Sequence, residues 1–135
     1  MANGKLEPAR PLSPHMQIYR PMLTMMMSIA HRISGVANAI GFLLLAWWLV
    51  AIASDPKAYA TVSGVFASLT GQVLLFLFSW ALIHHMLGGI RHLVWDTGRA
   101  LDKTSIEVLA WATIIGSTLL TVLLWVAGYA LKGGA

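Results

Sequence analysis

Three histidines stand close together in the second half of the sequence, at His84, His85 and His92. Imidazole binds haem iron and exchanges protons near neutral pH. In a helix, His85 and His92 would share nearly one face but lie about 10.5 Å apart along the axis. Two imidazoles that coordinate one metal from opposite sides are only about 4 Å apart. If His85 is an axial ligand, the second ligand must therefore come from another helix or chain.

Alternatively, these histidines form hydrogen bonds to a neighbouring helix. Their spacing does not distinguish this structural role from metal ligation. Gly88 and Gly89 follow directly and remove side chains from the helix surface. Such a surface would let either a flat macrocycle or another helix approach the backbone.

A hydroxyl, an imidazole and a guanidinium come together earlier in the chain, at Ser28, His31 and Arg32. Ser28 and Arg32 are four residues apart and would share a helix face, which His31 borders. A charged residue at the centre of a membrane helix costs about 2.5–3.5 kcal/mol, so it usually faces a partner or a wet cavity. These residues could thus present one polar ligand with hydrogen bonds and positive charge. Alternatively, Arg32 simply extends to the lipid headgroups.

The elements that carry these residues are predicted by the scarcity of charge. Only 10% of the 135 residues are charged and 58% are hydrophobic, whereas soluble domains have about 25% charged residues. Three stretches contain no acidic, basic or histidine residue, namely 33–53, 61–83 and 108–131. Each can cross a bilayer, which takes about 20 apolar residues. A lipid-facing segment must satisfy its own backbone, so helices are expected.

The sequence therefore predicts an all-α membrane protein with three transmembrane helices. They are expected at about 24–53, 61–95 and 105–131, within a membrane domain over 23–135. A polar N-terminal arm over 1–22 precedes them. Because cysteine is absent, this chain cannot ligate an iron–sulfur cluster or form a disulfide.

The distribution of cations predicts the orientation. Seven of the nine lysines and arginines fall on the side of the N-terminus, and only Lys57 and Lys132 fall on the other. By the positive-inside rule, the N-terminus is expected in the cytoplasm, or in the matrix of a mitochondrion. The cations are spread along the chain, so no nucleic-acid surface is predicted.

The two polar clusters are expected to meet. His85 lies 11 residues before Asp96, which is about 16 Å at helical rise and matches the estimated depth of Arg32 in the antiparallel neighbour. The third helix carries Ser117, Thr118 and Thr121. Their hydroxyls can bond to their own helix carbonyls, and we assign them a structural role.

Two sequence blocks support a family resemblance. The first is R-P-L-S-P-H at 10–15, followed by S-I-A-H-R-I-S-G at 28–35. The second is H-M-L-G-G-I-R-H-L-V-W-D-T-G at 85–98. In order and spacing, these blocks resemble the large cytochrome b anchor subunit of succinate dehydrogenase, respiratory complex II.

The resemblance implies a shared assembly in the bacterial inner membrane, or in the mitochondrial inner membrane of a eukaryote. This chain and a small membrane anchor subunit would hold haem b between them, and the arm over 1–22 would contact the soluble subunits. A flavoprotein subunit and an iron–sulfur subunit would carry FAD and the clusters. Together they would oxidise succinate and reduce ubiquinone, and no catalytic residue for succinate is expected in this chain.

The resemblance also implies roles for individual residues. His85 matches the axial haem ligand, and the spacing to Gly89 and His92 favours it over His84. His31, Arg32 and His92 match the propionate side of the haem. Ser28 and Arg32 match the quinone site, and Asp96 is a candidate for proton supply.

Three other interpretations remain open. One is a menaquinone-linked fumarate reductase anchor, which has the same architecture. The others are a haem-carrying electron shuttle without a soluble enzyme and a haem-free membrane scaffold.

Overall fold

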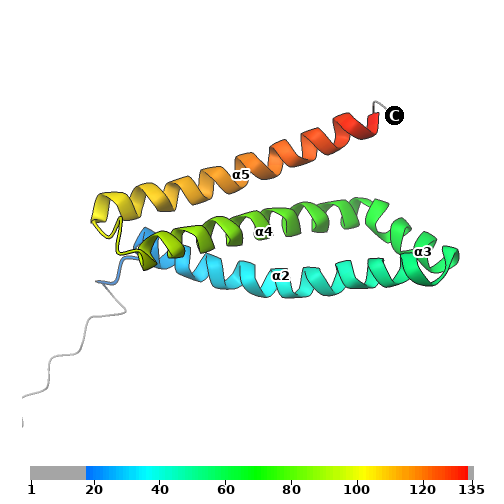
Figure 1. The fold of residues 1–135 in the computed structure, drawn as a ribbon, viewed down its shortest axis with the longest axis horizontal. Helices are drawn as coiled ribbons and strands as arrows, with labels where there is room; N and C mark the ends of the chain where they lie inside the picture. Colours follow the sequence, from blue (N-terminus) through cyan, green and yellow to red (C-terminus); the bar gives the residue numbers. More distant parts are fainter. Residues whose placement is uncertain (1–17, 134–135) are drawn as a thin grey trace, which may run out of the picture.

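The computed structural model describes residues 18–133, and that part of the chain is all-α (Figure 1). Its helices are α2 (Leu23–Ser54), α3 (Pro56–Ala67), α4 (Leu69–Asp96) and α5 (Lys103–Gly133). Three of them, α2, α4 and α5, are long and apolar enough to cross a membrane. This confirms the predicted fold class. Most of the arm predicted over 1–22, including the motif at 10–15, lies outside the described residues.

Consecutive long helices of the bundle are antiparallel and lie side by side. Figure 1 shows α4 between α2 and α5, with the short helix α3 at one end, where it joins α2 to α4. The packing follows this order, because α4 contacts both α2 and α5 more extensively than those two contact each other. We call the end with α3 the α3 end. The opposite end, which contains Leu23, Asp96 and Lys103, is called the histidine end.

The expected boundaries of the first and third transmembrane helices agree with α2 and α5 to within two residues at each end. The expected single helix over 61–95 is wrong, because the chain breaks at Ser68 into α3 and α4. Ser68 is extended, with ψ 156°, and its hydroxyl accepts a hydrogen bond from Gly71 N at 3.1 Å. A serine in this position caps the start of a helix. The absence of charged residues predicted one long apolar segment, but it could not predict that Ser68 begins a new helix within it.

The other turns also have local causes. Pro56 is the first residue of α3, where its missing N–H costs nothing. Between α4 and α5, Gly98 adopts a positive φ of 74°, which glycine tolerates. Asp102 precedes α5 and accepts a hydrogen bond from Ser105 N at 2.9 Å. These features fix where α5 begins beside α4.

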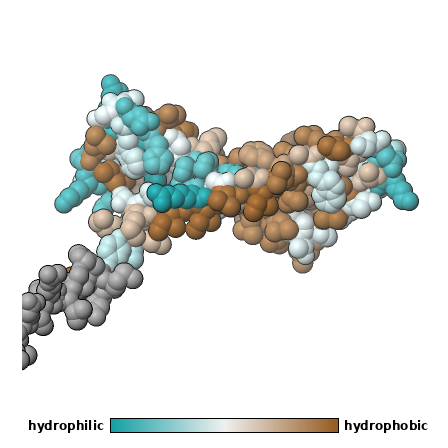
Figure 2. Space-filling view, turned by 90° about the horizontal axis from the view of Figure 1, so that it is seen from below, coloured by the Kyte–Doolittle hydropathy of each residue, from teal (hydrophilic) through white to brown (hydrophobic). Residues whose placement is uncertain are grey.

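The interior of the bundle contains mainly small and polar residues, and most large apolar side chains face outward. Much of the visible middle of the bundle is hydrophobic, and hydrophilic residues gather toward its two ends (Figure 2). The buried residues with a hydroxyl or amide are Ser34, Asn38, Thr113, Ser117 and Thr121. Lipid is as apolar as leucine, so membrane helices associate through small and hydrogen-bonding residues instead. The fold is thus that of a membrane helix bundle.

Candidate functional site

The two polar clusters meet between α2 and α4 near the histidine end, as their predicted depths required. The imidazoles of His31 and His85 are stacked, with ring centroids 4.0 Å apart and planes inclined by 12°. His85 Nδ1 lies 3.0 Å from the carbonyl oxygen of His31 and 3.2 Å from Ser34 Oγ. His31 and Ser34 of α2 therefore contact the imidazole of His85 on α4.

Glycines make this close approach possible. A Cβ added to Gly35 of α2 would lie 3.0 Å from His85 Cε1, and a Cβ added to Gly88 of α4 would overlap the His31 ring. Each histidine thus occupies the space that a glycine of the opposite helix leaves open. Gly89 differs, because a Cβ there would meet nothing within 4 Å in the described chain. Of the two glycines singled out in the sequence, Gly88 serves helix packing and Gly89 leaves an open surface.

The hydrogen bonds around His85 indicate which ring nitrogen carries its proton. Ser34 Oγ donates to the His31 carbonyl at 2.9 Å, so its oxygen is available as an acceptor. His85 Nδ1–H can then donate to both the carbonyl and the hydroxyl, and this assignment leaves the lone pair on Nε2. No residue of 18–133 forms a hydrogen bond to that Nε2. The ring is only partly buried.

His84 points in a different direction and is enclosed. It is 2% exposed, and its Nδ1 lies 3.2 Å from Ser117 Oγ of α5. Its ring stacks on Trp80 at 4.8 Å, and Trp80 Nε1 donates to Thr118 Oγ1 at 3.3 Å. Within residues 18–133, His84 Nε2 is buried without a partner. His84 therefore joins α4 to α5, and Ser117 and Thr118 contribute to its surroundings, which the sequence did not indicate.

A row of rings continues from His85 toward the histidine end. His92 contacts His31 edge-on at 5.2 Å, and it contacts Trp95 at the same centroid distance. His31 therefore lies between His85 and His92. His31 thereby links His85 and His92, which are about two turns apart on α4, into one continuous cluster.

Arg91 is buried, which the sequence did not predict for a cation. It is 3% exposed, and its guanidinium carbon lies 5.1 Å from the centroid of the Trp95 ring. Its Nε has no hydrogen-bond partner in the described part of the chain. A guanidinium over an indole face is favourable. Because its charge is buried without a paired anion, Arg91 would also attract an anionic group.

Ser28 and Arg32 line different hollows, although they are four residues apart. Ser28 borders a groove of about 680 Å³ at the histidine end, together with Trp95, Lys103 and Glu107. Arg32 is exposed and borders a separate, apolar hollow along α2. Asp96 is exposed at the last residue of α4. This chain therefore supplies parts of a polar region, and it does not close one pocket around Ser28, Arg32 and Asp96.

Metal binding by this chain would involve few side chains. Among residues 18–133, no three histidine or acidic residues come together as a metal site.

Comparisons with known proteins show which family this chain resembles. Residues 7–124 match the family described as succinate dehydrogenase/fumarate reductase transmembrane subunit. The chain is 43% identical over 114 residues to the succinate dehydrogenase cytochrome b556 subunit of Paracoccus denitrificans, with 84% of this chain and 88% of the relative covered. It is 37% identical to the subunit of the same name from Rickettsia bellii, with 87% and 91% covered.

A mitochondrial relative is more distant. The succinate dehydrogenase cytochrome B subunit of Schizosaccharomyces pombe is 33% identical, over 82% of this chain and 64% of the relative. The family match spans all three membrane helices up to Leu124. This chain therefore belongs to the family of succinate dehydrogenase and fumarate reductase transmembrane subunits.

Proposed function

We propose that this chain is a cytochrome b anchor subunit of succinate dehydrogenase that binds haem b through His85 and forms part of a ubiquinone-reduction site. The observation that carries the haem assignment is the position of His85 Nδ1, 3.0 Å from the His31 carbonyl. Histidines that bind metals usually donate their other ring N–H to a carbonyl or carboxylate, which fixes the tautomer and orients the ring. His85 has this support, and its Nε2 is not bonded within residues 18–133.

The surroundings of His85 fit a flat macrocycle. Gly89 lies one turn away on the same helix, and a Cβ there would meet nothing within 4 Å in the described chain. His84 is a poor candidate, because it is 2% exposed and packed between Trp80 and Ser117. When bound, haem would supply one-electron chemistry at a potential set by its ligands and surroundings. The residues of this chain would hold it, orient it and exclude water.

A small membrane anchor subunit would supply the second residue that holds the haem. The histidine cluster offers no second ligand of suitable geometry, because His31 stacks face to face on His85 rather than opposing it across a metal. His31, Arg32 and His92 would face the propionates, where charge-assisted hydrogen bonds form. The buried Arg91 adds a further positive charge beside Trp95. Together these residues would favour the carboxylate end of a haem.

The quinone would be bound by Ser28 and Arg32. Reduction of a quinone takes up two electrons and two protons, so its site needs donors to the carbonyl oxygens and positive charge near the developing anion. Ser28 and Arg32 have those properties but border separate hollows. Residues from the partner subunits would complete the site, and Asp96 at the rim would help to supply protons.

The rest of the assembly follows from what this chain lacks. It contains no cysteine, so the iron–sulfur clusters would belong to an iron–sulfur subunit. By the resemblance to the family, FAD would belong to a flavoprotein subunit. The relatives come from bacteria and from a mitochondrion. We place this chain in the corresponding inner membrane, with its N-terminus and the histidine end on the cytoplasmic or matrix side, where the cations are concentrated.

The test of this proposal uses the intact purified complex. A dithionite-reduced minus oxidised spectrum should show a b-type haem band, and absence of that band would refute haem binding. Turnover with succinate should be supported by ubiquinone. The family name also includes fumarate reductase, so turnover with a menaquinone and failure with ubiquinone would favour the fumarate reductase alternative.

A further inference from the structure

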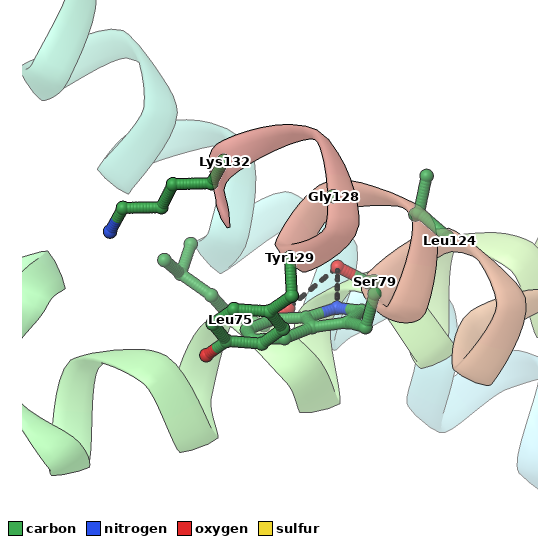
Figure 3. Close-up of a pocket in the computed structure, with 7 residues that line it drawn as sticks. Leu75, Ser79, Leu124, Gly128, Tyr129 and Lys132 are labelled. Carbon is green, nitrogen blue, oxygen red and sulfur yellow. Dashed lines mark hydrogen bonds between the residues drawn. The ribbon is translucent and has the colours of Figure 1, made fainter. Parts of the chain in front are cut away.

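A second groove lies far from the histidine cluster, at the α3 end of the bundle. It has a volume of about 410 Å³ and is lined by residues from the first turns of α4 and the last turns of α5 (Figure 3). Its lining includes Leu75, Ser79, Trp125, Gly128, Tyr129 and Lys132. None of them belongs to the proposed haem or quinone region.

The uncharged polar side chains of the groove are already bonded within the chain. Trp125 Nε1 donates to Ser79 Oγ at 3.4 Å, and Ser79 Oγ donates to the Leu75 carbonyl at 2.7 Å. The hydroxyl of Tyr129 donates to Gln72 Oε1 at 3.1 Å. The groove therefore presents mainly ring faces and aliphatic carbon to a ligand. Such a lining favours a hydrocarbon chain over a polar molecule.

The dimensions also suit a hydrocarbon chain. A Cβ added to Gly128 would meet nothing within 4 Å in the described structure, so the wall is open at that point. From Leu124 to Lys132 the groove follows α5 for about 12 Å at helical rise. One leaflet of a bilayer has a hydrocarbon depth of about 15 Å, half of the whole layer. An acyl chain of one leaflet can therefore lie along the groove.

A cation lies at the rim of this groove. Lys132 is in the last turn of α5, and Figure 3 shows its side chain extending beside Tyr129 and Leu75. A lysine at a membrane surface buries its aliphatic stem and keeps its ammonium among the headgroups. The sequence has one acidic residue at this end, Asp55, against Lys57 and Lys132. The rim is thus positive where a lipid phosphate would lie.

We propose that this groove binds a phospholipid with an anionic headgroup. One acyl chain lies between α4 and α5 against Trp125 and Tyr129, and the headgroup pairs with the ammonium of Lys132. The apolar wall retains the chain, and the charge at its end selects the anionic lipid over a zwitterionic one.

The test compares lipid retention by the intact complex. The complex is placed in phosphatidylcholine nanodiscs that contain a minority of phosphatidylglycerol, released into the gas phase, and analysed by native mass spectrometry. Lys132→Met keeps the apolar stem and should lower phosphatidylglycerol retention about 5-fold, the effect of one cation near a charged surface. Lys57→Met is the matched control, because Lys57 is exposed at the same end but on α3, and it should change retention little. Gly128→Leu fills the groove and should abolish retention of either lipid.

Three results would overturn the proposal. The first is equal retention of phosphatidylglycerol and phosphatidylcholine by the unmodified complex. The second is an equal loss in Lys57→Met and Lys132→Met, which would show a general charge effect. The third is capture of another subunit or an isoprenoid quinone by a photoreactive group placed at position 128. A normal haem spectrum in all three variants would show that the assembly is intact.

Discussion

The imidazoles of His31 and His85 stack at 4.0 Å across the interface between α2 and α4, and the carbonyl of His31 accepts from His85 Nδ1 at 3.0 Å. One residue thus contacts the face of the His85 ring and also fixes its tautomer. Because the acceptor is a backbone carbonyl, most substitutions of His31 would preserve the hydrogen bond. Orientation of His85 therefore depends on the position of the α2 backbone, which the two glycines at the interface determine.

The first prediction separates the adjacent histidines. His85→Ala should abolish the b-type haem band in the reduced minus oxidised spectrum, because its Nε2 is the proposed ligand. His84→Ala should keep the band. It should also lower the stability of the complex by about 2 kcal/mol, a common cost of truncating a buried side chain, because the ring packs between Trp80 and Ser117. Loss of the band in His84→Ala with retention in His85→Ala would reverse the assignment.

A second prediction concerns the two adjacent glycines. Gly88→Ala places a methyl group into the His31 ring, so the histidine and α2 must move. We expect a loss of about 1–3 kcal/mol, as for other overpacked sites, together with an altered haem spectrum. Gly89→Ala is the control, because its Cβ meets nothing within 4 Å in the described chain. It should be neutral or stabilising by up to about 1 kcal/mol through helix propensity. Thermal unfolding of the assembled complex measures both.

Gly89 also offers a separate check on the haem position. A larger substitution, Gly89→Phe, should fold but interfere with a macrocycle beside His85. Normal haem content in Gly89→Phe would argue against the open surface as the haem contact.

A third prediction tests Arg32 as a quinone residue. Arg32→Ala should lower succinate-dependent ubiquinone reduction at least about 10-fold, because positive charge near a developing oxyanion is lost. Succinate oxidation with an artificial electron acceptor should persist. Arg99→Ala removes an exposed cation in the loop after α4, and it should affect neither assay. Equal loss of both activities in Arg32→Ala would assign the residue to assembly instead.

A fourth prediction concerns pH and the start of α5. Hydrogen bonds from the side chain and backbone of Ser105 hold the pKa of Asp102 below its ordinary value of 3.8. Since the folded protein binds the proton less readily than the unfolded chain, the cap stabilises α5 fully above about pH 4 and is lost as the pH falls through the lowered pKa. Hydrogen-exchange protection of the first turn of α5 should therefore decrease at low pH.

Substitutions of Asp102 provide the control for this effect. Asp102→Asn keeps a capping oxygen without a titrating group, so protection of the first turn should no longer depend on pH in this range. Asp102→Ala should lower protection at every pH. An unchanged pH dependence in Asp102→Asn would assign the effect to another group.

Much of the architecture could be predicted from the sequence, for a physical reason. The bilayer is the solvent of this chain, so long stretches without charge had to be helices of a fixed minimum length. The rise per residue then placed His85 and the cluster around Arg32 at one depth, and the contact between His31 and His85 confirms it. The order and spacing of the motifs at 10–15, 28–35 and 85–98 pointed to the family that the comparisons show.

Composition could not locate the interruption at Ser68, because a serine is neutral and the residues on both sides are apolar. The break depends on one side-chain hydrogen bond to Gly71 N. Ser117 is a second residue whose full role the sequence could not show. Its hydroxyl donates to Ile114 O within its own helix, as predicted, but it also accepts a hydrogen bond from His84 of α4.

The sequence by itself determined that three helices cross a membrane and that the polar residues of α2 and α4 meet at one level. Only the tertiary structure decided which neighbour each residue faces. His84 and His85 are adjacent in sequence but about 100° apart around the helix, so one packs on α5 and the other on α2. Arg91 is buried, and Ser28 and Arg32 border separate hollows although they are only four residues apart. These outcomes depend on how the helices are turned against one another, and that rotation is set by packing across the interfaces, which one helix does not encode alone.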